Sequence, residues 1–194
     1  MPHTATRIAP VDAPVLDVVG ARWSTRIFDR ATAIDEGALA SALEAARWAP
    51  SASNTQPTRF IVARRGSDAH AVVAAALSRG NVGWAVDAGA LVVVVAETAT
   101  ADGERRRWAE FDAGQASAYF SLQAHADGLM VHPMGGFDPA AIAAGFALPE
   151  RLVPIAVLAV GALGDPDDAD PAMLAREQGP RVRRPVAESV LVDD

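Results

Sequence analysis

Two prolines, Pro50 and Pro57, enclose the segment that most constrains the fold of this chain, the nine residues 49–57 with the letters APSASNTQP. Each proline fixes its own φ and restricts the residue before it, so a helix cannot continue through Pro50 and the chain must turn before the next element. Between the prolines stand two Ser, one Asn and one Gln, more polar groups than a plain turn needs. Rigid loops that present amides and hydroxyls often bind ligands, so we predict that this loop does.

A second polar motif occupies residues 22–26, where the letters RWSTR alternate cation, hydroxyl and cation. In an extended segment, side chains two residues apart share one side, so Ser24 and the two flanking arginines would lie together. Guanidinium pairs and a hydroxyl suit the oxygens of a phosphate monoester. Arg181 and Arg183 repeat the spacing near the other end of the chain. An anionic, hydrogen-bonding cofactor is therefore predicted; taken alone, the first motif also fits a solvated basic turn.

The length and composition fit one globular domain. The chain has 194 residues, of which 51% are hydrophobic and 21% charged. Its longest apolar runs, 88–96 and 152–163, are shorter than the roughly 20 residues that span a bilayer, so we interpret them as buried strands. No secretory signal is visible at the N-terminus, and the chain has no Cys. We expect a soluble, cytoplasmic protein with no membrane partner.

The formal net charge of −7 argues against nucleic acid as the main partner. Positive charge is concentrated in three arginine clusters, at residues 22–30, 105–107 and 181–184, and the chain has no lysine. We interpret the run 105–107, which Trp108 follows, as exposed helix or loop surface.

The histidines predict no metal site, because none of them forms a ligand pair with i,i+4 spacing. His132 lies just before Gly135-Gly136, a pair that allows a backbone to approach a ring closely or simply to turn. His132 could donate a proton there, but it could equally be structural. The motifs of serine hydrolases, phosphate-loop nucleotidases and Rossmann dehydrogenases are missing from the sequence.

Hydrophobic periodicity, caps and breakers predict alternating helices and strands. The expected helices cover 36–48 with Asp35 as N-cap, Ser67 to Gly80, 112–127 and 139–146 after Asp138; the expected strands cover 60–63, 91–95, 155–160 and 187–192. Residues 1–14 are expected to be an irregular leader, and residues 164–180 a surface excursion. A lone terminal strand at 187–192 must pair with something outside its own neighbourhood.

Taken together, these motifs resemble those of the FMN-dependent nitroreductase family, and the resemblance covers about residues 15–192. Residues 50–57 resemble the family signature Pro-Ser-x-x-Asn-x-Gln-Pro, and residues 22–26 resemble its Arg-x-Ser-x-Arg motif. The resemblance implies an FMN site formed by Arg22, Trp23, Ser24, Arg26, Pro50, Ser51, Ala52, Asn54, Gln56, Asn81, Pro133, Met134, Gly135, Gly136, Arg181 and Arg183.

The resemblance also implies roles within that site. Arg22 and Ser24 would bind the FMN phosphate, on which the C-terminal arginine pair would close. Arg26 would lie near the N1/O2 edge of the flavin, and Asn81 at its pyrimidine edge. The backbone N–H of segment 133–136 would face flavin N5. The 50–57 loop would reach the FMN that the other subunit mainly holds.

The fold that the resemblance implies is α+β, a three-layer α-β-α arrangement around a mixed, mostly antiparallel sheet. It forms an intertwined homodimer, with helix 112–127 at the interface and the terminal strand, within 187–194, added to the partner's sheet. The whole chain, 1–194, is then one domain.

The implied activity is NAD(P)H-dependent reduction of nitroaromatics, quinones or related electrophiles. Hydride would pass through the flavin in a ping-pong sequence whose first step requires no side-chain acid or base, and no catalytic residue is assigned. Trp84 stands where some relatives place Lys, Thr58 where many have Trp, and the stretch 97–112 is shorter than the lid of many relatives. The alternatives are a relative with different chemistry (an enal reductase, a dehalogenase or a flavin-fragmenting enzyme) and a non-catalytic FMN-binding protein.

Overall fold

The strand β2 (Ala90–Glu97) organises the fold, because its apolar run is buried on both faces. The computed structural model describes residues 7–193. In it, β2 pairs on one side with β1 (Thr58–Arg64) and on the other with β4 (Leu152–Gly161), which in turn pairs with β3 (Met130–Met134). The sheet order is therefore β1-β2-β4-β3. As predicted, the strands at 60–63, 91–95 and 155–160 form, while β3 was not predicted.

Every strand pair within residues 7–193 is antiparallel. The expected α+β class is confirmed, but the expected mixed sheet is not present in the single chain. A strand that pairs in parallel would have to come from outside residues 7–193 of this chain, for example from a partner subunit.

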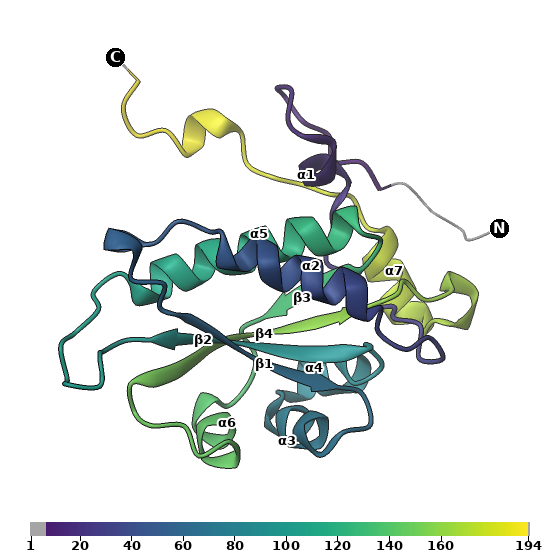
Figure 1. The fold of residues 1–194 in the computed structure, drawn as a ribbon. Coiled ribbons are helices and arrows are strands. Elements are labelled where there is room, and N and C mark those ends of the chain that lie inside the picture. Colours follow the sequence, from purple (N-terminus) through teal and green to yellow (C-terminus); the bar gives the residue numbers. More distant parts are fainter. Residues whose placement is uncertain (1–6, 194) are drawn as a thin grey trace.

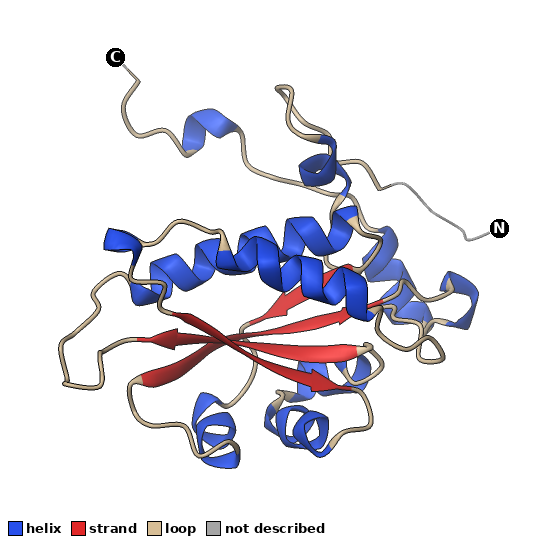
Figure 2. Cartoon of the chain, viewed as in Figure 1, coloured by secondary structure: helices blue, strands red, loops and turns tan. Residues whose placement is uncertain are grey.

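Helices cover both faces of the sheet, as Figures 1 and 2 show. The helices α2 (Glu36–Arg47) and α5 (Ala109–Ala126) lie over one face, and α3 (Asp68–Ala76), α4 (Arg79–Ala85) and α6 (Pro139–Gly145) over the other. Because side chains alternate along a strand, Val92 and Val94 pack towards α2 and α5, and the neighbouring valines of β2 pack towards the opposite layer.

Three predicted N-caps are confirmed. The Asp35 carboxylate accepts a hydrogen bond from the Ala38 N–H at 3.0 Å, and the Ser67 hydroxyl accepts one from the His70 N–H at 3.1 Å. Asp138 caps α6 by accepting from the backbone N–H groups of its first turn. Each cap pairs an N–H group that the helix itself leaves unbonded.

The helix predicted from Ser67 to Gly80 is wrong in its second half. The first helix ends at Ala76, Leu77 is extended, and α4 begins at Arg79, so Gly80 lies inside a second helix instead of ending the first. Leu77 forms an antiparallel bridge with Phe137, whose backbone competes with helix formation at this point. The break turns α4 towards the end of β3.

Other boundaries also differ from the prediction. The helix α5 begins at Ala109, so Asp112 lies within its first turn and not at its start. Two helices fall where none was expected, α1 (Asp17–Ala21) after the leader and α7 (Pro171–Gln178) in the predicted surface excursion. Asp170-Pro171 opens α7 with the same cap and first-turn proline as Asp138-Pro139, so this helix carried a readable signal.

The C-terminal segment forms no strand in the single chain. Residues Val186–Glu188 make a short 3-10 turn, and the following residues to 193 are irregular and exposed. Figure 1 shows this yellow segment running past α1 and away from the sheet. Its pairing with a partner subunit stays a prediction. Residues 7–14 of the leader carry no helix or strand, as expected, while residues 1–6 and 194 lie outside the described residues.

Among the described residues, no helix combines the length and the apolar character that crossing a membrane requires.

Candidate functional site

Three arginines gather where the N-terminal and C-terminal segments meet. The Arg22 side chain lies 3.4 Å from the Ser24 hydroxyl, and Arg181 and Arg183 approach it from the C-terminal segment. The pKa of Arg22 is lowered by burial and then by the charges of Arg181 and Arg183. Within residues 7–193, none of the three forms an ion pair with a carboxylate. Repulsion without a counter-charge makes this arginine cluster a candidate anion site.

The arginines of this cluster are not equivalent. Arg181 donates to the carbonyls of Gly20 and Arg22, at 2.7 Å each, and to the carbonyl of Arg7. It therefore ties the C-terminal segment to the end of α1. Within the part of the chain that the structure describes, Arg183 donates only to the carbonyl of the residue before it, so most of its donors stay available for a ligand.

The segment 22–26 is anchored by a residue that the sequence analysis did not single out. Glu177, at the end of α7, accepts from the Trp23 indole N–H at 2.6 Å and from the Arg26 backbone N–H at 3.2 Å. The Trp23 ring meets the edge of His125 on α5, with centroids 6.0 Å apart. Trp23 therefore anchors the motif, while the predicted ligand-binding side chains flank it.

The predicted ring-binding residues meet at the junction of α4 and β3. The Asn81 amide donates to the Gly136 carbonyl at 2.9 Å. A Cβ on Gly136 would lie 2.7 Å from the Asn81 and Ser78 side chains, so a larger residue there would displace both of them. A Cβ on Gly135 would meet nothing within 4 Å, so the backbone there faces open space. Pro133 and Met134 end β3 beside this pair.

Trp84 links this junction to the 22–26 segment. The Arg26 guanidinium lies 5.7 Å from the Trp84 ring centroid, and the Trp84 ring lies 4.5 Å from that of His132. The position where some relatives place a lysine is thus filled by a buried aromatic residue that positions Arg26. Arg26 is the cation that this junction presents.

His132 has a structural role in this arrangement. Its Nδ1 lies 2.7 Å from the Thr25 carbonyl oxygen. Since a carbonyl only accepts, the hydrogen of the neutral imidazole is assigned to Nδ1. Burial lowers the pKa of His132, the nearby Arg26 lowers it further, and the bond to Thr25 opposes the shift. His132 is therefore neutral at pH 7 and joins β3 to the N-terminal motif.

The 50–57 loop adopts an unusual backbone. Ser53, Asn54 and Gln56 all have positive φ, between 47° and 55°, a region that non-glycine residues seldom adopt. The Ser51 hydroxyl accepts from the Gln56 N–H at 3.0 Å, and the Gln56 amide donates to the Asn54 carbonyl at 3.2 Å. Ser51 and Gln56 thus hold the loop itself, which the sequence did not reveal. Strained loops of this kind are typical of binding sites.

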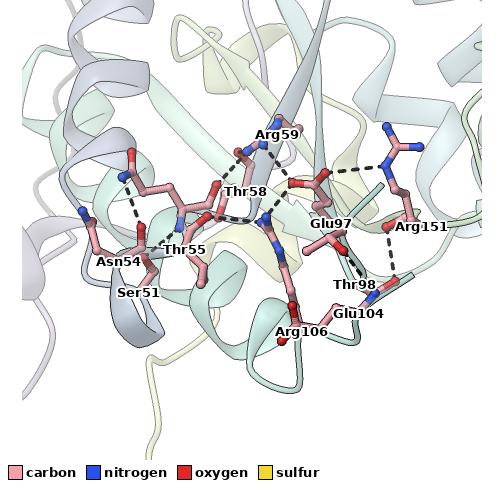
Figure 3. Close-up of polar contacts among 12 residues, drawn as sticks. Ser51, Asn54, Thr55, Thr58, Arg59, Glu97, Thr98, Glu104, Arg106 and Arg151 are labelled. Carbon is pink, nitrogen blue, oxygen red and sulfur yellow. Dashed lines mark hydrogen bonds and ion pairs between the residues drawn. The ribbon is translucent and has the colours of Figure 1, made fainter. Parts of the chain in front are cut away.

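Two acidic residues fix the loop to the rest of the fold. Asp112, only 3% exposed on α5, accepts from the Ala52 N–H at 3.1 Å. Glu97, at the end of β2, binds three arginines, as Figure 3 shows: Arg59 at 2.9 Å, Arg106 at 3.0 Å and Arg151 at 3.6 Å.

Arg106 extends this network to the loop, because it also donates to the Thr55 carbonyl at 3.2 Å. Its own backbone N–H donates to the Thr98 carbonyl at 2.8 Å. The connection between β2 and α5 and the 50–57 loop are therefore one linked unit around Glu97.

The two halves of the predicted site lie at opposite ends of α5. The 50–57 loop is bonded to Asp112 in the first turn, while Trp23 of the arginine motif packs on His125 in the last. The rise along the helix from Asp112 to His125, 125 − 112 = 13 steps, corresponds to about 20 Å. One chain therefore brings the arginine cluster and the α4–β3 junction together, but it does not bring the 50–57 loop to them.

Comparison with known proteins agrees with this architecture. Residues 19–162 match the family described as the nitroreductase family. The chain belongs to the nitroreductase family. As a member it is an oxidoreductase, and the resemblance found in the sequence is confirmed.

Three relatives illustrate this membership. A solved structure described as an oxidoreductase containing FMN is 32% identical, with a TM-score of 0.87 over 94% of this chain and 93% of that one. An uncharacterised 15.4 kDa protein of Mycolicibacterium smegmatis is 41% identical over 64% of this chain and 88% of its own. A Bacillus subtilis protein named "Putative NAD(P)H nitroreductase YdgI" is 29% identical over 77% of this chain and 88% of its own.

The Asp112 contact predicts that this nitroreductase-family protein loses stability when the carboxylate is removed. Asp112→Ala leaves the Ala52 N–H without its partner, which costs about 1–3 kcal/mol of unfolding free energy. Glu110→Ala, an exposed acidic residue in the same turn, is the control and should change it by under about 0.5 kcal/mol. Urea denaturation measures both, and equal effects would contradict the assigned contact.

His132 should titrate below its ordinary pKa of 6.5 in the folded protein. On acidification the unfolded chain then takes up the proton first, so this residue's contribution lowers stability as the pH falls below about 6.5 and has no effect above it. NMR titration of the imidazole Cε1–H signal, assigned with His132→Gln, gives the midpoint. A midpoint at or above 6.5 would contradict the neutral, structural role.

Proposed function

We propose that this protein binds FMN and uses NADH or NADPH to reduce nitroaromatics, quinones or related electrophilic acceptors, in two alternating half-reactions at one site. The observation that carries the proposal is the arginine cluster, which has no counter-charge among the described residues. Its member Arg22 belongs to the same segment, 22–26, as Arg26, which lies beside Trp84 at the α4–β3 junction. One end of this region suits a phosphate, and the other suits a planar ring.

The phosphate end fits the group by charge. FMN ends in a phosphate monoester with close to two negative charges near neutral pH. Arg22 and Arg183 would supply guanidinium donors and Ser24 a hydroxyl, and the dianion would relieve the repulsion that lowers the pKa of Arg22. Arg181 would hold the C-terminal segment closed over this end.

The ring end fits by shape and by donors. The open backbone at Gly135, the Asn81 amide and the Arg26 guanidinium are a polar set of the kind that orients a flavin and stabilises negative charge on it. When bound, FMN supplies the redox chemistry, taking hydride from NAD(P)H and passing electrons to the acceptor. The chain's own residues bind and orient it, and no side chain is assigned as a proton donor.

Names of relatives support the same cofactors. The solved relative at 32% identity is described as containing FMN, and the Bacillus subtilis relative is named as an NAD(P)H nitroreductase. The cytoplasmic location expected from the sequence stays a prediction.

We further propose that the protein acts as a homodimer that completes each site with the 50–57 loop of the partner subunit. Since α5 separates the loop from the arginine cluster by about 20 Å, a second chain is the simplest way to join them. The exposed side of α5 carries Gly114, Ala118 and Tyr119, a stripe of small and apolar residues that suits close helix packing. The exposed tail, with Leu191 at 94% exposure, offers further apolar surface.

The visible spectrum of the purified, FMN-loaded protein tests the function. A flavin spectrum that bleaches on anaerobic addition of NADH or NADPH, and returns when 4-nitrobenzoate or a quinone is added, is expected. A flavin spectrum that neither donor bleaches would indicate a protein that only binds flavin. Failure to load FMN would refute the proposal.

Variants assign the phosphate end in the same assay. Arg22→Ala/Arg183→Ala removes two charged donors, and each charged hydrogen bond contributes about 1.5–3 kcal/mol, so the Kd for FMN should rise at least about a hundredfold. Arg64→Gln, an exposed arginine that pairs with Glu36 at the far end of β1, is the control and should leave the Kd unchanged. Flavin fluorescence titration measures both.

Mixed dimers test the shared site. One subunit carries Arg22→Ala/Arg183→Ala and the other Asn54→Ala/Gln56→Ala, co-expressed with different tags. A mixed dimer has one site with both defects and one with neither, so it should bind one FMN per dimer with near wild-type affinity. A mixed dimer no better than the parents would place each complete site within a single chain.

A further inference from the structure

The run Arg105–Arg107 lines a basic hollow beside the 50–57 loop. This hollow, of about 310 Å³, lies between loop residues such as Ser53 and Thr55 and the connection that precedes α5. Arg106 is committed to Glu97 and to the Thr55 carbonyl. Within residues 7–193, Arg105 and Arg107 form no ion pair with a carboxylate.

Carboxylates nearby leave this hollow positive. Three arginines, at 105–107, and two carboxylates, Glu104 and Asp112, line it. Since Glu97, which pairs with Arg106, also pairs with Arg59 and Arg151, it does not remove this excess of positive charge. In a protein with a net charge of −7, this local excess of positive charge is a property of the site and not of the whole surface.

An aromatic surface adjoins the basic hollow. A second hollow of about 310 Å³, lined by Pro50, Trp108 and Phe111, shares Trp108 and Asp112 with the first. Trp108 is 52% exposed and Phe111 64%, and their rings meet edge to face with centroids 6.4 Å apart. The Arg107 guanidinium lies over the Trp108 ring, 4.9 Å from its centroid, so a cation covers one face of this exposed aromatic residue.

We propose that Arg105 and Arg107 form a subsite for an anionic group, a carboxylate or a phosphate, on an aromatic substrate whose ring packs against Trp108. This inference rests on the proposed function. Only in the proposed dimer would the flavin held by the partner subunit lie next to the 50–57 loop and this subsite. Arg106, between the two arginines of the subsite, bonds both Glu97 and the Thr55 carbonyl, so the subsite is fixed to the loop. The anion could belong to the acceptor or to the 2′-phosphate of NADPH.

The test compares 4-nitrobenzoate with its neutral analogue 4-nitrobenzamide. Isothermal titration calorimetry on the oxidised, FMN-loaded protein gives the Kd of each without turnover. The double variant Arg105→Gln/Arg107→Gln should weaken nitrobenzoate binding about tenfold or more and change nitrobenzamide binding less than about twofold, since it removes charge-assisted bonds only. Arg64→Gln, with the same loss of charge per residue at the far end of β1, should change neither.

A second arm locates the anion. If nitrobenzoate binding is unaffected but the KM for NADPH rises about tenfold while that for NADH stays constant, the subsite binds the donor's phosphate. A third outcome is that the double variant changes neither the Kd of nitrobenzoate relative to nitrobenzamide nor the KM for NADPH relative to NADH. If FMN then stays bound and is still bleached by NADH or NADPH, the subsite proposal is overturned and the proposed function stands. Loss of FMN from the double variant alone would also overturn it, by assigning the arginines to the cofactor. A wild-type protein that binds no FMN would refute both.

Discussion

The packing of α5 against the sheet determines where both parts of the site lie. Ala109, Ala113, Ala116, Phe120 and Ala124 form one buried side of this helix, and the small residues among them allow close approach to β2 and β3. Its first turn bonds the 50–57 loop and its last turn packs on the arginine motif. Because a helix is a rigid rod of fixed rise, the separation between these contacts is fixed once the core forms.

Charge that the chain leaves uncompensated supports the proposed anion site. Elsewhere the chain pairs its polar groups with carboxylates. Glu97 forms ion pairs with three arginines around the loop, and Glu177 accepts two N–H groups in the 22–26 segment. Arg22 and Arg183 nevertheless lack such partners within the described residues. Burying part of a guanidinium beside like charges costs stability, which a bound anion would restore.

The sequence predicted well where a local rule decides the structure. Asp35, Ser67 and Asp138 cap helices as expected, because a cap depends on residues within one turn. The buried strand at 91–95 was equally readable from its unbroken apolar run. By the same rule Asp170-Pro171 indicates the start of α7, so the helix missed within the surface segment 164–180 was an error of interpretation and not a lack of information.

Prediction failed where a distant segment competes with local preference. Leu77 leaves its helix because it pairs with Phe137, and Asp112 serves the loop instead of the helix end because Ala52 lies beside it. Neither partner is visible from neighbours in the chain. The backbone at Ser53, Asn54 and Gln56 is strained in the same way. Hydrogen bonds from the loop to Asp112 and Arg106, which lie outside it, offset the free energy of that strain.

The sequence by itself determined the family, the two polar motifs and most of the elements that carry them, since motif spacing and hydrophobic period are local properties of the chain. Tertiary structure alone decided which of those residues meet. It joined Arg22 to Arg183 across most of the chain, gave His132 a neutral structural role, and placed the 50–57 loop about 20 Å along α5 from the arginine cluster. Such meetings depend on packing between distant segments, which no local pattern encodes.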